Sequence, residues 1–144
     1  MQPSDLAKSG TESGHQRAVF AWAALNRERF PMLEFLFHIP NGGSRGDDAR
    51  SRMIRGANMK ADGVKPGVYD LFLPYPIAGR HGLFIEMKKP GEVKSTSFDQ
   101  KRFGLWIESN GYTNAVCDNW QHAVSVIEAY LTTGIIPKGN SDGT

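Results

Sequence analysis

Three ionisable residues stand near the ends of two short apolar segments. Asp70 lies within the run 67–73, and Glu86 and Lys88 close the run 83–88. Both runs are bounded by Gly and Pro, which predicts two buried strands. Side chains alternate along a strand, so Glu86 and Lys88 share one face, with their Cα atoms roughly 7 Å apart. If Asp70 lies alongside them on a neighbouring strand, two carboxylates and a lysine converge.

These residue types fit a metal-dependent hydrolytic site for phosphodiesters. Mg²⁺ and Mn²⁺ prefer oxygen ligands, can hold the attacking water and can neutralise developing charge. We expect Asp70 and Glu86 to supply ligands, with the backbone carbonyl of Met87 as a further oxygen. Lys88 would orient the water or stabilise negative charge. The same residues also fit a solvated ion pair where a strand emerges, and the spacing alone does not separate the two interpretations.

The remaining sequence predicts the elements that position these residues. In chain order we expect a helix from about 11–13 to 29, a strand at 32–39, a short helix at 47–59, the two strands above, a helix at 97–110, a strand at 112–117 and a helix at 119–132. The short connection between the two central strands favours antiparallel pairing, and the helical crossover before residue 112 favours a parallel pair. The order α-β-β-β-α-β-α predicts an α/β fold, a small mixed sheet flanked by helices.

Length and composition limit the class of protein. The 144 residues are enough for one domain with a real core but not for two. We expect one domain at 11–134 between flexible tails at 1–10 and 135–144. The net charge of +2 permits nucleic-acid binding without requiring it. No apolar run has the length of a membrane span, and the polar start is no signal peptide, so we expect no membrane partner and a cytoplasmic location.

Several other residue types have structural interpretations. The single cysteine, Cys117, excludes an internal disulfide and a multi-cysteine zinc site, and we expect it to be a buried strand residue. Trp22, Trp106 and Trp120 fall on apolar helix faces, which predicts that they lie in the core. The scattered histidines are expected to be structural rather than ligands; they are His15, His38, His81 and His122.

The wider pattern around the ionisable residues resembles the virus-type replication-repair nuclease (VRR-NUC) domain of the PD-(D/E)xK superfamily. The segments that carry the resemblance are 63–71, 84–88, 38–43, Gln100 and 110–112. The similarity spans roughly residues 12–131. The family's usual proline before the aspartate is Tyr69 here, at a position that shapes the backbone and performs no chemistry. The resemblance implies a restriction-endonuclease-like core.

The resemblance also implies an activity. It points to an Mg²⁺- or Mn²⁺-dependent endonuclease that hydrolyses DNA, often selective for branched or structured substrates. Stand-alone members are similar to Holliday-junction resolvases that work as homodimers or larger homo-oligomers, and a phage or prophage origin is suggested. A nicking or end-processing nuclease remains an alternative, as does a non-catalytic DNA-binding or assembly module on the same fold.

Three further residues gain candidate roles from the resemblance. The family has an acidic metal-site residue on the first helix, which points to Glu12. A glutamine one turn later accompanies it, which points to Gln16 as a supporting contact toward DNA. Gln100 is expected near the catalytic strand, where it would bond Lys88 or a phosphate. Each of the three also completes an S-x-x-E/Q capping box, so a purely structural role stays open.

The stretch 45–65 is rich in arginine and lysine. Flexible basic side chains and a Gly-rich backbone suit contacts to DNA phosphates. The candidate contacts are Asn41, Arg45, Lys60 and Lys65. The alternative is a solvated polar loop, in which nearby aspartates offset part of the charge.

Overall fold

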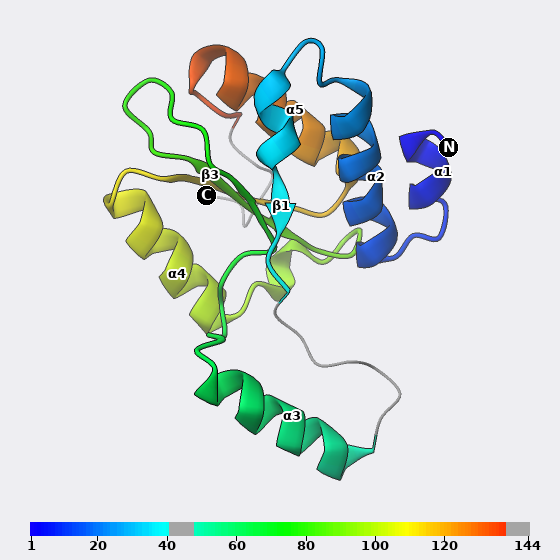
Figure 1. Cartoon of the computed structure of the whole chain (residues 1–144), viewed down its shortest axis with the longest axis vertical. Coiled ribbons are helices and arrows are strands. Elements are labelled where there is room, and N and C mark those ends of the chain that lie inside the picture. Colours follow the sequence, from blue (N-terminus) through cyan, green and yellow to red (C-terminus); the bar gives the residue numbers. More distant parts are fainter. Residues whose placement is uncertain (41–47, 138–144) are drawn as a thin grey trace.

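A four-stranded mixed sheet forms the centre of the structure, a computed structural model that describes residues 1–40 and 48–137 (Figure 1). The strands are β1 (Phe37–His38), β2 (Leu71–Leu73), β3 (Leu83–Met87) and β4 (Thr113–Cys117), and they lie in the order β1-β2-β3-β4. The pairs β1–β2 and β2–β3 are antiparallel, whereas β3–β4 is parallel. The predicted directions of the central pairings are therefore confirmed.

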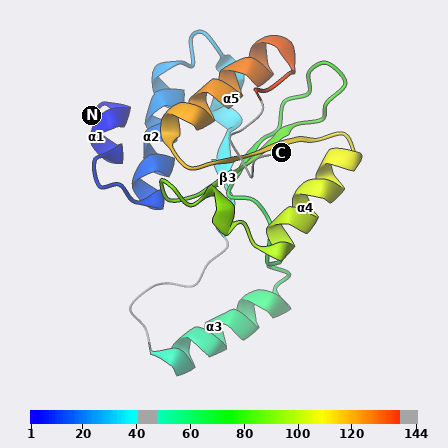
Figure 2. The ribbon, with the colours of Figure 1, turned by 180° about the vertical axis from the view of Figure 1, so that it is seen from behind.

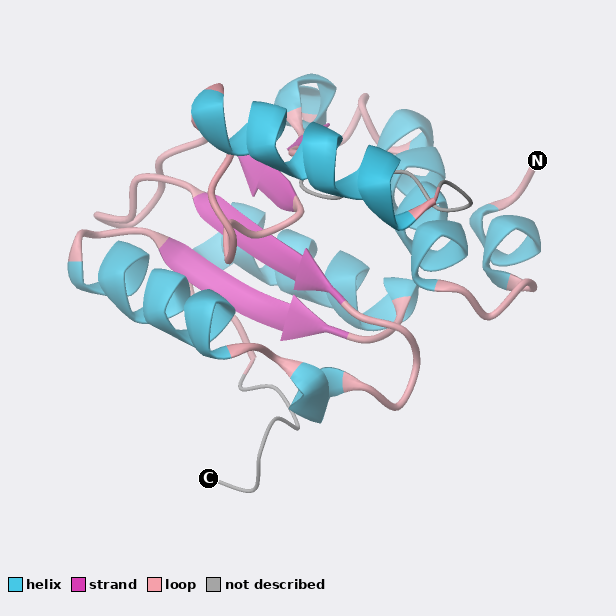
Figure 3. Cartoon of the chain, turned by 90° about the horizontal axis from the view of Figure 1, so that it is seen from below, coloured by secondary structure: helices cyan, strands magenta, loops and turns pink. Residues whose placement is uncertain are grey.

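Helices lie on both faces of the sheet. One face carries α2 (Glu12–Leu25), α5 (Trp120–Thr133) and the 3₁₀ helix η1 (Pro31–Phe35), and α4 (Phe98–Ser109) and α3 (Ala49–Ala61) lie on the other side (Figures 1 and 3). Short helices α1 (Pro3–Ala7) and η2 (Val93–Ser95) complete the set. The predicted α/β fold class is confirmed. Within the described ranges, no helix is long and apolar enough to cross a membrane.

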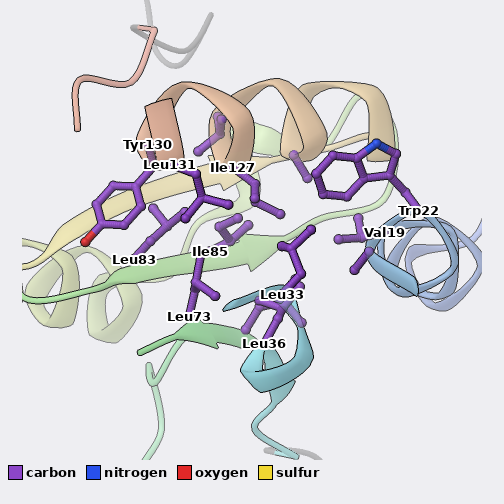
Figure 4. Close-up of a cluster of buried hydrophobic side chains, with 14 of the residues drawn as sticks. Val19, Trp22, Leu33, Leu36, Leu73, Leu83, Ile85, Ile127, Tyr130 and Leu131 are labelled. Atoms are coloured by element: carbon purple, nitrogen blue, oxygen red, sulfur yellow. The ribbon is translucent and has the colours of Figure 1, made fainter. Parts of the chain in front are cut away.

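Alternation along β3 separates the core from the chemistry. Leu83, Ile85 and Met87 are buried and belong to the hydrophobic cluster under α2 and α5 (Figure 4). Burying one such side chain stabilises the folded protein by about 1.5–3 kcal/mol. Rotating the strand so that its other face met the core would lose this contribution for all three residues. Phe84 and Glu86 consequently point toward the side of α4. Cys117 is buried in the same cluster, as predicted.

The start of the chain differs from the expectation. We expected a flexible tail at 1–10, but α1 occupies part of it and Pro3 is buried. Proline suits the first turn of a helix because its missing N–H would have no partner there. Asp5 adds a cap, since its Oδ2 accepts a hydrogen bond from the backbone N–H of Gln2 at 3.1 Å. The predicted tail at 135–144 lies largely outside the described residues.

The first strand is much shorter than the predicted strand at 32–39. Residues Pro31–Phe35 form η1, and only Phe37–His38 pair with β2. Leu33 and Leu36 are both buried, and their spacing of three places them on one side of a 3₁₀ turn. A strand would have pointed them to opposite faces, so burial of both favours the tight helix.

One predicted core residue lies in solvent. Trp106 on α4 is 64% exposed, whereas Ile107 and Gly104 of the same helix are buried. The buried side of α4 therefore includes Ile107 but not the neighbouring Trp106. Trp22 is buried as predicted, and Trp120 is half-buried against the core.

His15 connects α2 to the start of α5. Its ring is buried, and its Nδ1 accepts a hydrogen bond from the backbone N–H of Trp120 at 3.0 Å. Trp120 is the first residue of α5, so its N–H has no partner within the helix. The bond requires an unprotonated Nδ1 and hence a neutral ring. Burial lowers the pKa of His15 below 6.5, against a smaller raising effect of Asp118.

We expect the stability advantage of the wild-type protein over His15→Gln to shrink on acidification. The unfolded chain takes up a proton near the ordinary pKa, whereas the folded protein resists it, so the stabilisation is present above that pKa and is lost as pH falls through the lowered one. Urea unfolding at a series of pH values measures the difference. His122→Gln is the control, because it removes another histidine and leaves the His15 bond intact; an advantage that did not vary with pH would contradict the assignment.

Candidate active site

Glu86 and Lys88 lie at the carboxyl end of β3, on the side of the sheet that faces α4. Both residues are buried, with 4% and 9% of their surfaces exposed. The strand end is fixed by β4, because the Lys88 N–H donates to the Cys117 carbonyl at 2.8 Å. Beyond it, the Gly91 N–H donates to Asp118 Oδ2 at 2.9 Å, which holds the following turn. The pair is therefore no solvated strand end.

Asp70 immediately precedes β2 and faces the same site. Leu71 pairs with Ile85, and this register places Asp70 opposite Glu86. Asp70 Oδ2 accepts a hydrogen bond from the Met87 N–H at 2.9 Å. This bond orients the carboxylate toward β3. The predicted convergence of Asp70 with Glu86 and Lys88 is thus present in the structure.

The backbone of Asp70 is held from the other side by β1. Its carbonyl accepts hydrogen bonds from the Ile39 N–H at 2.6 Å and from His38 Nδ1 at 2.9 Å. Because a carbonyl only accepts, the His38 proton lies on Nδ1. Sequence reasoning treated His38 as an isolated structural histidine and did not connect it to Asp70. His38 belongs to the segment 38–43, which resembles the VRR-NUC family, and this is the sequence feature that could have linked His38 to the site.

Gln100 bridges Glu86 and Lys88 at the end of β3. Its Oε1 accepts from Lys88 Nζ at 2.8 Å, and its Nε2 donates to Glu86 Oε2 at 2.6 Å. Lys88 Nζ also lies 3.4 Å from the same Glu86 oxygen. Gln100 completes the capping box of α4 as well, because its Oε1 accepts from the Ser97 N–H at 3.0 Å. The two roles left open for this residue are therefore compatible.

The pKa values of both carboxyl groups, Asp70 and Glu86, are raised. Burial, together with the neighbouring Asp70 charge, raises the pKa of Glu86 to about 8, against the lowering influence of Lys88. Burial also raises the pKa of Asp70, whereas its bond from the Met87 N–H opposes that shift. In the absence of a cation, the site therefore holds a proton more tightly than free carboxylates would.

The site offers oxygen atoms that could bind a ligand. Glu86 Oε1 is a buried oxygen without a hydrogen-bond partner among the described residues. The peptide group of Met87 adds an acceptor: its N–H points to Asp70, and the carbonyl of a strand residue points to the same side as its N–H. Such an oxygen set suits a hard divalent cation. The residues present therefore fit the expected Mg²⁺ or Mn²⁺.

Glu12 is the first residue of α2, and Gln16 lies one turn later on the same helix. They continue, toward the start of α2, the stripe of Val19 and Ala23, which pack in the core opposite α4. Within the described ranges, no three His, Cys, Asp or Glu side chains gather closely enough to hold a metal ion. The role of Glu12 as a third carboxylate therefore stays a prediction, as does the contact by Gln16.

The predicted DNA contacts are only partly described. Asn41 and Arg45 lie outside the described residues. Lys60, on α3, and Lys65, after it, are exposed. No residue of α3 is buried, and the helix extends away from the rest of the molecule (Figure 2).

The fold and the site together define the class of protein. A mixed sheet with an aspartate, a glutamate, a lysine and a glutamine at one end of its central strand is the arrangement of a nuclease-family domain. No family model and no curated protein matches the chain. A solved structure described as a VRR_NUC domain protein is similar to it, with 28% identity and a TM-score of 0.68 over 93% of this chain and 94% of that one. This similarity confirms the resemblance to the VRR-NUC domain of the PD-(D/E)xK superfamily.

We expect Asp70→Asn to gain stability relative to the wild-type protein as pH rises toward about 8. The folded wild-type protein keeps a proton on Glu86 that the unfolded chain releases near its ordinary pKa of 4.5, so raising pH through this window favours unfolding. Removing the Asp70 charge weakens that effect. Chemical unfolding in a chelating buffer across the window measures it, with Glu34→Gln, an exposed carboxylate on η1, as the control. A stability difference that is constant with pH would contradict the coupling.

Proposed function

We propose that this chain is a metal-dependent endonuclease that hydrolyses phosphodiester bonds in branched or structured DNA, such as a Holliday junction. The observation that carries the proposal is the hydrogen-bonded set of Asp70, Glu86, Lys88 and Gln100 at one end of β3, in which Glu86 and Lys88 are buried. The similarity of the chain to a VRR_NUC domain protein supports the nuclease class. A cytoplasmic setting and a phage or prophage origin stay predictions.

Each side chain has a separate part in the proposed reaction. Asp70 and Glu86 hold Mg²⁺ or Mn²⁺, with the Met87 carbonyl as a further ligand. When bound, the ion supplies positive charge next to the scissile phosphate and acidifies the attacking water. Lys88 orients that water or stabilises negative charge on the phosphate. Gln100 positions Lys88 and Glu86 through its two hydrogen bonds.

The exposed cations of α3 support DNA as the substrate. Arg50, Arg52 and Lys60 are exposed on this helix, and Lys65 follows it. Clusters of basic side chains bind DNA phosphates with a strong dependence on salt but carry little sequence information. We assign them to holding the DNA backbone while the selection of DNA shape lies elsewhere.

A nicking or end-processing nuclease and a non-catalytic DNA-binding or assembly module are the two alternatives on the same fold. One panel of DNA substrates distinguishes them from the proposed endonuclease. Labelled duplex, flap, splayed-arm and four-way-junction DNA are incubated with Mg²⁺ or Mn²⁺. Paired symmetric cuts in the junction are the expected result, whereas single nicks or trimmed ends would favour a nicking or end-processing nuclease. Binding without any cut would favour a non-catalytic module and would contradict the proposal.

We expect Lys88→Ala and Asp70→Ala each to abolish cleavage while leaving DNA binding largely intact. Both side chains lie at the proposed reaction site, and loss of one electrostatic group in such a site typically costs about 100-fold or more in rate. Single-turnover cleavage and gel-shift binding measure the two effects. Lys89→Ala is the matched control, because Lys89 is the adjacent, exposed lysine. Unchanged cleavage by either variant of Lys88 or Asp70 would refute the assignment.

Removing divalent cations should stop the reaction reversibly. Asp70 and Glu86 are the proposed ligands, so excess chelator should abolish cleavage, and re-added Mg²⁺ or Mn²⁺ should restore it. The cleavage rate measured before, during and after chelation tests this. Full activity in excess chelator would exclude the proposed mechanism.

We also propose that the active species is a homodimer or a larger homo-oligomer, because paired cuts require two active sites. Trp106 and Leu105 support it as neighbouring, exposed apolar residues on α4. Light scattering coupled to size exclusion should give at least twice the chain mass of 15.9 kDa. Trp106→Glu should shift the mass toward the monomer, whereas Leu25→Glu, an exposed leucine on α2, should not. A monomeric wild-type protein at the concentration used for cleavage would contradict this part.

A further inference from the structure

Phe37 is an exposed aromatic residue on the same side of the sheet as the candidate active site. It lies on edge strand β1, is 46% exposed and pairs with Phe72 of β2. The two rings meet edge to face, with centroids 5.8 Å apart and planes at 84°. Paired residues of antiparallel strands point to one face, so Phe37 and Phe72 share it. Asp70 lies two residues before Phe72, at the same face, about 7 Å along the chain.

The aromatic residues form a row that runs beside the row of ionisable groups. Phe72 stacks on Phe84 of β3, with centroids 4.3 Å apart and planes at 28°. Phe84 is two residues before Glu86, as Phe72 is two residues after Asp70. A row of three rings thus crosses β1, β2 and β3 directly next to the carboxylates.

The two ends of this aromatic row have different surroundings. At the β4 end, Phe84 packs against Phe103 of α4 and against Tyr112. At the β1 end, Phe37 keeps nearly half of its surface exposed. Phe84 is less exposed than Phe37, because aromatic rings pack against it from both sides. The open ring at β1 therefore offers an aromatic surface beside the site.

The basic side chains on this side of the sheet favour a polyanion as the ligand. Helix α3 lies on the same side of the sheet as α4 (Figure 3) and exposes Arg50, Arg52 and Lys60. Single-stranded nucleic acid binds where cations meet its phosphates and aromatic rings stack on its bases. This side of the sheet presents both kinds of side chain. Bases within an intact duplex are already stacked on their neighbours and cannot offer a face to Phe37.

We propose that Phe37, supported by Phe72, stacks an unpaired nucleobase of the DNA next to the phosphate that is cleaved. The surface thereby selects DNA with an unpaired or unstacked nucleotide at the cut, as at a flap, gap or open junction. The inference rests on the proposed function of the Asp70–Glu86 site and deepens it by naming the feature of the DNA that the site selects.

Stacking can be measured without cleavage. The Asp70→Asn variant is mixed with a duplex that carries one unpaired 2-aminopurine, whose fluorescence is quenched when it stacks on an aromatic ring. We expect quenching with Phe37 intact or changed to Tyr, and its loss in Phe37→Ala, with binding of this probe weakened about tenfold. Phe35→Ala is the matched control: Phe35 is an exposed phenylalanine on η1, which packs on the opposite face of the sheet. Equal quenching by Phe37→Ala and Phe35→Ala would overturn the proposal.

The active protein gives an independent measurement. In wild-type protein, the ratio of cleavage rates for the unpaired substrate and the matching duplex should exceed one, and Phe37→Ala should lower it about tenfold while Phe37→Tyr preserves it. Full preservation by Phe37→Leu would overturn stacking, because leucine retains apolar area without a ring. A change of oligomeric mass in Phe37→Ala, with an unaltered ratio, would assign the surface to a second copy and also overturn it. Absence of cleavage with quenching retained would instead reject the proposed function alone.

Discussion

Gln100 joins Glu86 and Lys88 at the buried end of a core strand, and the site depends on this contact. Lys88 Nζ and the Ser97 N–H are both donors, so they meet Oε1 and leave Nε2 to donate to Glu86. The orientation of the amide is therefore fixed by helix capping as well as by the site. A hydrogen bond to a charged group contributes about 1.5–3 kcal/mol, so moving the ends of α4 and β3 apart would be costly.

The first turn of α4 also positions the segment that leads to Asp70. Gly67 has a φ of +91°, and a Cβ built there would lie 2.5 Å from the carbonyl oxygen of Asp99. Only glycine suits this close approach and this backbone conformation. One helix terminus thus packs against the chain before Asp70 and holds Gln100 toward β3. The site is assembled from segments far apart in sequence. A rigid start of α4 would keep the charged side chains of the site at fixed distances from one another.

The sequence could predict those parts of the fold that local pattern determines. Apolar runs, capping residues and connection lengths were sufficient for the central strands, their directions and α2, α4 and α5. Residues 1–10 and the strand at 32–39 were misassigned because the burial of Pro3, Leu33 and Leu36 depends on packing partners. At the site, the convergence of the two carboxylates and the lysine was predictable from strand alternation. For Gln100, the capping box and the contact at the catalytic strand were expected only as alternatives, because the sequence does not reveal that one amide can make both.

The central claim is that Asp70 and Glu86 form the divalent-cation site and that Lys88 serves it without being a ligand. Calorimetric titration of the chelator-treated protein with Mn²⁺ tests this directly, without DNA and without catalysis. We predict saturable binding by the wild-type protein, retained binding by Lys88→Ala and loss of binding by Asp70→Asn. Equal binding of Mn²⁺ by the wild-type protein and Asp70→Asn, or no binding by either, would contradict the account.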